Sequence, residues 1–351
     1  MALPTTLPAP ILPRLVGGPR LRWGVLAPGF IAGLFAGTLH RNTDQRIVAV
    51  ASRSAARAEA FATLHDIPSH VDDYRRLVED PHVDIVYIAA PHSEHARLAI
   101  LALDAGKHVL VEKPIASSAA EAREIAQVAG RSGRFAMEAM HTRFHPRITV
   151  IDQLLEDGAL GALALVQAEL GLGGASVDPR GRLLNPELGG GAALDLGVYP
   201  LWFHDFVLGS PSRVQVSGTR AITGVEDQWN ATLHHADGSL GLVSATMRTW
   251  TPSHAAIGGA HGRIHLDSRH PQPGGFTLYD RDNRPVHRFD DDSGIVGAQG
   301  LCRQAAWAAQ HIADRLTESP LHPLSTSIRV LETVDAVRDG LRSPDLAEAQ
   351  R

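Results

Sequence analysis

Three side chains in this sequence have types and positions that suit proton transfer at an alcohol oxygen. Asp195 and Tyr199 lie four residues apart at the start of a predicted helix, so their side chains share one face. Lys113 ends a predicted buried strand, in the tripeptide Glu112-Lys113-Pro114. An ammonium near a phenol favours the phenolate, which can accept a proton, and an aspartate can orient either group. The spacing alone leaves a second interpretation open, in which Asp195 caps the helix and Tyr199 packs in the core.

A glycine-containing turn precedes this lysine, between a predicted strand and a predicted helix. The glycine positions of the dinucleotide pattern G-x-G-x-x-G are held by Ala27, Gly29 and Ala32. Gly29 keeps the position where backbone approaches a pyrophosphate, and alanine is an accepted variant at the third position, whereas Ala27 departs from the pattern. The backbone amides at the start of the helix, at Phe30 and Ile31, would then face the phosphates.

The end of the next predicted strand indicates which nucleotide would bind. An Asp or Glu there would hold the ribose 2′-hydroxyl of NAD, but this sequence has Ser52 and Arg53, with Arg57 close behind. No acid repels a 2′-phosphate, and a guanidinium can pair with it through two hydrogen bonds. The sequence therefore favours NADP over NAD, unless Arg53 is only a solvated surface charge.

The elements that must position these residues alternate along residues 21–140. Nearly continuous apolar strands alternate with amphipathic helices there, which predicts a parallel sheet covered on both faces. After residue 140 a helix is followed by extended segments joined by turns, which predicts a mostly antiparallel sheet. The expected class is α/β, with a doubly wound Rossmann domain at residues 21–140 and a second α/β domain at residues 141–351. The expected Rossmann strands lie at residues 21–27, 46–53, 84–91, 107–114 and 134–140.

The composition excludes several other classes. The net charge of −5 contains no strong charge block, so neither nucleic acid nor an anionic membrane surface is an expected partner. A single cysteine excludes a disulfide framework and fits a reducing cytosol, so we expect a cytoplasmic protein. No apolar run is long enough to span a membrane, and the start of the chain does not read as a secretory signal. The 19 histidines are scattered without HExxH spacing, and we expect no metal site.

Residues 1–20 contain five prolines and favour extended backbone over helix. This composition indicates an N-terminal arm. It leaves open whether the arm is a disordered lead or wraps a neighbouring subunit.

Four segments taken together resemble the glucose–fructose oxidoreductase/inositol dehydrogenase (Gfo/Idh/MocA) family. They are GVLAPGFIA, AAPHSEHARLAILALDAGKHVLVEKPIA, FAMEAMHTRFHP and GGGAALDLGVYP. Within the family they are most similar to dimeric trans-dihydrodiol dehydrogenases and NADP-dependent D-xylose 1-dehydrogenases. The resemblance runs from about residue 21 to the C-terminus. It implies that the C-terminal domain has a large open sheet through which two copies form a homodimer.

The resemblance also implies roles for individual residues. Lys113 matches the lysine of the EKP motif, Tyr199 the catalytic tyrosine or histidine, and Asp195 the aspartate of D-x-G-x-[HY]. His141 stands where close relatives usually have tryptophan, a departure that bears on the substrate pocket. The residues implied beside the nicotinamide are Pro91, His92, His95 and Glu112, and those implied along the substrate cleft are Arg143 and Phe144.

The activity expected from these features is hydride transfer between a nicotinamide and a secondary hydroxyl or hemiacetal of a small sugar, polyol or trans-dihydrodiol. Tyr199 would be the general acid/base, assisted by Lys113 and oriented by Asp195. One alternative is a cofactor-bound sensor without turnover, which would not need these three residues together. Another is an enzyme whose tightly held cofactor recycles in place, as in glucose–fructose oxidoreductase.

Overall fold

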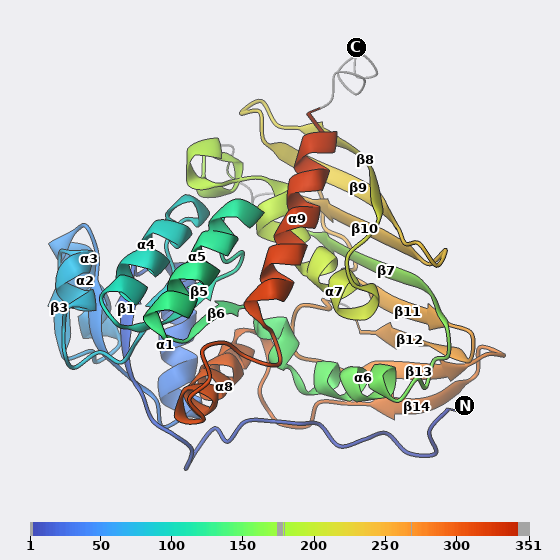
Figure 1. Ribbon diagram of the computed structural model, residues 1–351, viewed down its shortest axis with the longest axis horizontal. Helices are drawn as coiled ribbons and strands as arrows, with labels where there is room; N and C mark the ends of the chain where they lie inside the picture. The colour runs from blue at the N-terminus through green and yellow to red at the C-terminus, as the bar shows by residue number, and fades with distance from the viewer. Residues whose placement is uncertain (1–2, 174–177, 179, 268, 343–351) are drawn as a thin grey trace. The chain divides into compact units, whose positions relative to one another are not determined.

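The computed structural model describes residues 3–173, 178, 180–267 and 269–342, and the described chain forms two compact units (Figure 1). We call the first the Rossmann unit; it contains residues 12–144 and 295–328. We call the second the sheet unit; it contains residues up to Ile11, residues 145–294 and the chain from Arg329 onward. The C-terminal part of the chain thus supplies one segment, 295–328, to the Rossmann unit.

The Rossmann unit is built on a six-stranded parallel sheet of order β3-β2-β1-β4-β5-β6. This order confirms the predicted doubly wound fold, whose nucleotide crevice lies where the strand order reverses, here between β1 and β4. The strands are β1 (Arg22–Leu26), β2 (Arg46–Ala51), β3 (Ser69–Val71), β4 (Ile85–Ile88), β5 (His108–Glu112) and β6 (Ala136–Ala139).

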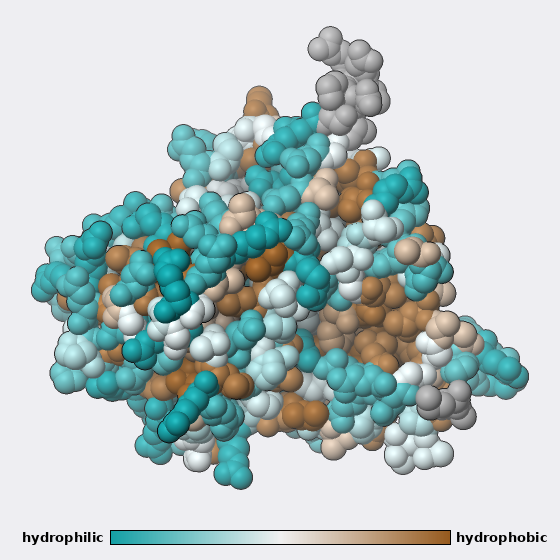
Figure 2. Space-filling model, viewed as in Figure 1, coloured by the Kyte–Doolittle hydropathy of each residue, from teal (hydrophilic) through white to brown (hydrophobic). Residues whose placement is uncertain are grey.

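Helices of the Rossmann unit pack on this sheet through apolar side chains. An aromatic stack joins α1 to the sheet, because the Phe35 ring lies 3.9 Å from Tyr87 and 5.4 Å from Trp23, centroid to centroid. The outer surface of the helices is mainly hydrophilic (Figure 2). The helices are α1 (Phe30–Asn42), α2 (Ala55–Leu64), α3 (Tyr74–Val78), α4 (His92–Asp104), α5 (Ala119–Ser132) and α8 (Leu301–Ala313).

The sheet unit contains an eight-stranded sheet of order β14-β13-β12-β11-β7-β10-β9-β8, in which only β7 and β10 pair in parallel. This confirms the predicted, mostly antiparallel second sheet.

Helix α7 (Val198–Leu208) packs on β7 and β10, and Trp202 and Phe203 of this helix are fully buried. The strands are β7 (Leu163–Gly171), β8 (Arg213–Arg220), β9 (Glu226–His234), β10 (Leu240–Thr246), β11 (Ala255–Gly259), β12 (Gly262–Leu266), β13 (Phe276–Asp280) and β14 (Pro285–Phe289); the remaining helices are α6 (Pro146–Glu156) and α9 (Leu324–Gly340). Across the described parts of both units, no helix combines the length and apolar character needed to cross a membrane.

Three strands had no sequence prediction, each for a physical reason. β3 has three residues, too few to display a period of two. β11 reads Ala-Ala-Ile-Gly-Gly, in which the alanines and glycines have low strand propensity. It forms a strand because it pairs with β7 on one side and β12 on the other. β14 begins at a proline, which is tolerated because β14 is an edge strand.

The N-terminal arm is extended and hydrogen-bonded to its own chain from residue 3 onward. In the sheet unit the carbonyl of Pro4 lies 2.8 Å from His287 Nε2, and the Ile11 amide donates to Thr149 Oγ1 at 3.0 Å. In the Rossmann unit the Gly17 amide donates to an Asp44 carboxylate oxygen at 2.8 Å. The described part of the arm therefore has hydrogen-bond partners within its own chain.

Candidate functional site

The residues predicted to bind the nucleotide gather at one edge of the Rossmann sheet. Parallel strands present their carboxyl ends at the same edge, and the turns after β1, β2, β4 and β5 all open there, around the strand-order reversal. The residues brought together at this edge are Ala27, Gly29, Phe30, Ile31, Ser52, Arg53, Arg57, Pro91, His92, His95, Glu112 and Lys113.

The turn after β1 fits the close approach of a phosphate. Ala27 has φ +61°, in the left-handed region, which explains why glycine is the common residue there and why alanine is a strained replacement. Gly29 is the N-cap of α1, no side chain caps the helix, and its first turn carries no acid. A Cβ built on Gly29 would meet nothing nearer than the Ala27 carbonyl at 4.0 Å, so the space beside this backbone is open. Free amides at a helix start suit a pyrophosphate.

The end of β2 carries two exposed guanidinium groups. Ser52 is buried, with its hydroxyl accepting from the Ser54 amide at 3.3 Å, and Arg53 and Arg57 follow on the surface. Ser54 caps helix α2, which fixes the direction in which the chain leaves the strand. Within the described residues no carboxylate pairs with either arginine. The position that would face a ribose 2′-phosphate, at the end of β2, is therefore basic.

His95 ties the turn after β4 to the turn after β5. Its Nδ1 lies 2.7 Å from the Pro114 carbonyl and its Nε2 lies 2.8 Å from the Ala90 carbonyl. Because both partners are acceptors, only a ring that carries a proton on each nitrogen donates to both. His92 is buried beside it, with the two rings 5.6 Å apart. These histidines hold the edge of the site from inside the protein.

Lys113 is half-buried between buried neighbours at the end of β5. The preceding Glu112 is buried and accepts a 2.5 Å hydrogen bond from the Tyr87 hydroxyl, which links the site to the aromatic stack. Burial raises the pKa of Glu112 to about 7, against the hydrogen bond from Tyr87 and the charge of Lys113, which lower it. The Lys113–Pro114 peptide bond is cis.

The residues predicted along the substrate cleft form a buried 3-10 turn, His141–Phe144, after β6. Burial, and then the charge of Lys113, lower the pKa of His141 to about 3, so this imidazole is neutral at ordinary pH. Arg143 Nε donates to the Leu321 carbonyl at 2.7 Å. Phe144 is fully buried in the hydrophobic core of the Rossmann unit. A direct role of Arg143 or Phe144 toward substrate remains a prediction.

Asp195 and Tyr199 lie in the sheet unit, where a wide turn leads into α7. Residues Ala193–Gly197 form a π-helical turn, a rare element that is common at functional sites, and the α-helix begins at Val198. Gly197 permits this turn to pack closely, because a Cβ there would lie 2.3 Å from the Trp229 ring. Asp195 is buried and Tyr199 is half-buried.

Two further residues of the sheet unit support this turn and were not predicted. Arg182 Nη2 lies 3.1 Å from Asp195 Oδ1, with 41% of the Arg182 side chain exposed and 9% of that of Asp195. Glu226 Oε1 accepts from the Ala193 amide at 3.3 Å. Arg182 lies in residues 171–188, a stretch with no periodic pattern, part of which lies outside the described residues. Arg182 lies thirteen residues before Asp195, and no motif in the sequence indicated that the two residues would pair.

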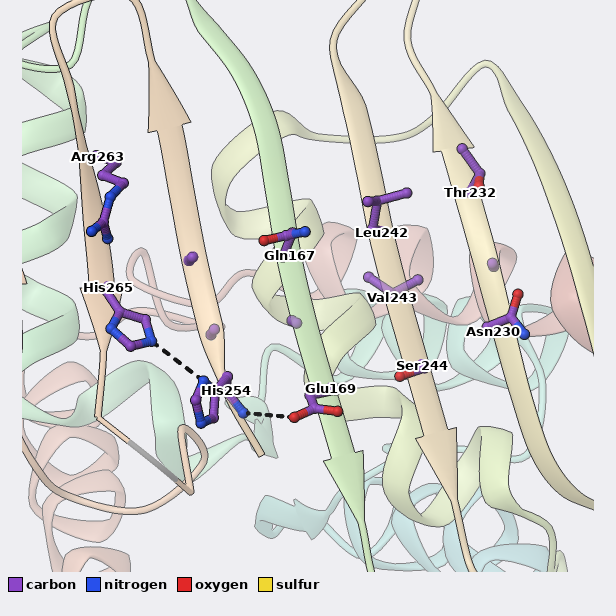
Figure 3. Close-up of a pocket in the computed structure, with 14 residues that line it drawn as sticks. Gln167, Glu169, Asn230, Thr232, Leu242, Val243, Ser244, His254, Arg263 and His265 are labelled. Atoms are coloured by element: carbon purple, nitrogen blue, oxygen red, sulfur yellow. Dashed lines mark hydrogen bonds between the residues drawn. The ribbon is translucent and has the colours of Figure 1, made fainter. Parts of the chain in front are cut away.

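A hollow of about 690 Å³ lies on one face of the eight-stranded sheet and contains none of the predicted site residues. Its lining comes from β7, β9, β10, β11 and β12, and Figure 3 shows both polar and apolar side chains projecting into it. Two histidines meet there, since His265 Nε2 lies 3.4 Å from His254 Nδ1. Other residues along this face include Gln167, Glu169, Thr232, Leu242, Ser244 and Arg263.

Comparison with known proteins agrees with the predicted resemblance. Residues 21–140 match the family model described as oxidoreductase family, NAD-binding Rossmann fold, and residues 148–265 match that of the GFO/IDH/MocA C-terminal domain. The chain is 31% identical over 331 residues to trans-1,2-dihydrobenzene-1,2-diol dehydrogenase of Sus scrofa, with 92% of this chain and 97% of the relative covered. The Homo sapiens protein of the same name is 31% identical over 326 residues, with the same coverage.

Solved structures show the same fold. Levoglucosan dehydrogenase, solved with NADH and levoglucosan, superposes with a TM-score of 0.82 at 20% identity, covering 94% of this chain and 98% of its own. A 3-ketoreductase from Actinomadura kijaniata, solved with NADP, superposes with a TM-score of 0.78 at 27% identity, covering 92% and 98%. The sequence match, the strand order and the open carboxyl edge agree, and the chain belongs to the Gfo/Idh/MocA family of oxidoreductases, with an NAD-binding Rossmann fold at residues 21–140.

Proposed function

We propose that the protein is an NADP-dependent dehydrogenase that oxidises a secondary hydroxyl or hemiacetal of a small sugar, polyol or trans-dihydrodiol. The observation that carries the choice of nucleotide is the basic end of β2, where Arg53 and Arg57 are exposed and no described carboxylate pairs with them. A 2′-phosphate suits this position, and an acid that would exclude it is missing from the sequence between Ala51 and Arg57.

The nucleotide would be held by groups that the Rossmann unit already positions. The amides at Gly29, Phe30 and Ile31 would bind the pyrophosphate, because the helix start is uncapped and the space beside Gly29 is open. Pro91 and His92, at the start of α4, would line the nicotinamide end. When bound, the nicotinamide supplies or accepts the hydride.

The chain itself would move the proton. Tyr199 is the proposed general acid/base, because a phenol can exchange a proton with the substrate hydroxyl as its carbon gains or loses a hydride. Asp195, held by Arg182, would fix the turn that leads into α7, the helix that carries Tyr199. Lys113 would donate a hydrogen bond to the reacting oxygen and favour the ionised phenol. His141 would not serve as an acid, because burial keeps its imidazole neutral.

The proposed substrate class follows from the relatives and from His141. Curated relatives are named for a dihydrodiol. Among the solved structures of the same fold, a levoglucosan dehydrogenase was crystallised with levoglucosan and an aldose-aldose oxidoreductase with glycerol. The family resemblance implies tryptophan at the position of His141, which is instead a neutral ring with hydrogen-bonding nitrogens. This ring would accept a more polar substrate than an indole would.

Initial rates against a substrate panel test this proposal. D-xylose, D-glucose, myo-inositol and a trans-dihydrodiol are each offered with NADP and, in parallel, with NAD. We expect turnover of one compound with a higher kcat/KM for NADP. Absence of turnover across the panel, with NADP still bound in a fluorescence titration, would contradict the substrate class, and an equal or higher kcat/KM for NAD would contradict the nucleotide choice.

We further propose a homodimer through the face of the eight-stranded sheet that holds the hollow. The support is the mixed lining of this face and the exposure of 40% of Leu242 within it (Figure 3). Sedimentation velocity should find a dimer that Leu242→Glu converts to monomer. Leu64→Glu, at a leucine 75% exposed on the Rossmann unit, is the matched control and should leave the dimer intact. A monomeric wild-type protein at micromolar concentration would contradict the assignment.

A further inference from the structure

The turn that carries Lys113 is held by side chains from three other elements rather than by regular backbone pairing. Its residues, 113–118, form no helix or strand. His95 of α4 contacts the Pro114 carbonyl, and Glu121 of α5 accepts from the Ser117 amide at 2.9 Å. The most buried of these restraints comes from β6, where Glu138 Oε1 accepts from the Ile115 amide at 3.0 Å.

Glu138 is a carboxylate with a 1% exposed surface, and three partners satisfy it. Its second oxygen, Oε2, accepts from the Ser327 hydroxyl at 2.6 Å and lies 2.9 Å from His322 Nε2. His322 and Ser327 are themselves buried, each 1% exposed. Burial alone would raise the pKa of Glu138, but the hydrogen bonds from His322, Ser327 and Ile115 and the charge of His322 outweigh it and hold the pKa below its ordinary value. An ionised acceptor makes a stronger hydrogen bond to the Ile115 amide than a neutral one.

The three side chains do not form a hydrolytic triad. Ser327 and His322 both point at the same oxygen of Glu138. Their own Oγ and Nε2 atoms lie 3.2 Å apart, buried in the core. With no exposed nucleophile, the cluster has no substrate to act upon. Toward the site, the cluster contacts the Ile115 amide, two residues after Lys113.

We propose that Glu138, held in place by His322 and Ser327, is a positioning residue that sets the location of the Lys113 ammonium. Segment 295–328, which joins the Rossmann unit from the far end of the chain, thereby contributes to catalysis without touching substrate. The inference rests on the proposed role of Lys113. Displacement of a reacting group by about 1 Å can cost about a hundredfold in rate, so loosening one turn is enough to be measured.

The first test needs no substrate. Hydrogen exchange, followed by mass spectrometry on the full-length protein, reports the peptide that spans residues 113–118. Glu138→Gln and Ser327→Ala should each accelerate exchange in this peptide. Gln45→Ala is the matched control, because Gln45 is a buried hydrogen-bonding residue before β2, at the amino edge of the same sheet. Unchanged exchange in both variants would overturn the proposal, and Ser327→Ala decides if Glu138→Gln does not fold.

The second test separates positioning from stability. With the compound that the panel identifies, Glu138→Gln should lower kcat by about ten- to a hundredfold, with both KM values changed less than about twofold. Gln45→Ala should leave kcat unchanged. In a Lys113→Arg background the effect of Glu138→Gln should largely vanish, since two changes on one path are not additive. An unchanged kcat, or the full loss repeated in that background, would overturn the proposal.

Failure of this inference and failure of the proposed function are distinguishable. If Lys113→Met keeps full turnover, the role of Lys113 itself is wrong. If Lys113→Met abolishes turnover while Glu138→Gln does not change kcat, the role of Lys113 stands and only the positioning by Glu138 is wrong.

Discussion

Arg182 holds the carboxylate of Asp195 at 3.1 Å, within the π-helical turn that leads into α7, the helix that carries Tyr199. The aspartate is nearly buried and the arginine is partly exposed, so the ion pair fixes the less accessible partner. An arginine is well suited to this, because its planar group keeps further donors available after one hydrogen bond is made. Arg182 therefore supports Asp195, and nothing in the sequence indicated this contact.

Replacement of Arg182 by methionine should lower kcat/KM by about tenfold, because a charge-assisted hydrogen bond that orients Asp195 is lost. Arg180→Met is the matched control, an exposed arginine two positions away, and should change kcat/KM little. Equal kinetics of the two variants would show that the ion pair has no part in turnover.

The proposed acid/base residues give the largest expected losses. Lys113→Met and Tyr199→Phe should each lower kcat by about a hundredfold or more, the usual contribution of a positioned acid or base, while NADP still binds. Lys107→Met is the control for Lys113, because Lys107 lies before the same strand, at its amino end, and donates to the carbonyls of Asp80 and Val83. Most of the turnover surviving in either site variant would remove that residue from the mechanism.

The sequence was sufficient for the fold where apolar strands alternate with helices, since that periodicity directly reflects burial. It was also sufficient for the position of Lys113 at the carboxyl end of β5, because the end of a parallel strand has a known position in a doubly wound sheet. It was insufficient for the hydrogen bonds that hold these elements. Glu138 and His322 are far apart in the chain, and nothing local marks them as partners.

The π-helical turn at Ala193–Gly197 is a second feature that depends on a tertiary contact and could not be predicted from the sequence. The segment Gly-Gly-Gly-Ala-Ala-Leu-Asp predicts a glycine-rich entry into a helix, which is correct. The wider turn depends on the packing of Gly197 against Trp229, a residue of another element. A contact of this kind is set by tertiary structure and leaves no periodic trace in the sequence.

Nucleotide preference should depend on Arg53. Arg53→Asp should lower kcat/KM for NADP by about tenfold to a hundredfold, because a charge-assisted hydrogen bond to the 2′-phosphate is replaced by repulsion. The value for NAD should stay level or rise. Arg41→Asp, at an exposed arginine in the last turn of α1, controls for the change in net charge. An unchanged ratio between the two nucleotides would place recognition of the 2′-phosphate elsewhere.

Glu112 should make the stability of the nucleotide-free protein depend on pH. The pKa of Glu112 is raised from 4.5 to about 7 in the folded protein, chiefly by burial, so between these values the folded state binds more protons than the unfolded state. Stability contributed by this group therefore falls as pH rises from about 4.5 to about 7 and is constant above that. The full difference corresponds to about 3 kcal/mol.

Glu112→Gln removes this titration while keeping an acceptor for the Tyr87 hydroxyl. The thermal midpoint of the variant minus that of the wild-type protein should therefore increase as pH rises from 5 to about 7. Above about pH 7 this difference should stay constant. Glu124→Gln, at an exposed glutamate on α5, should track the wild type throughout. A constant difference between Glu112→Gln and wild type across this range would mean that Glu112 is already ionised at pH 5, and that the charge of Lys113 and the Tyr87 hydrogen bond outweigh the cost of burying it.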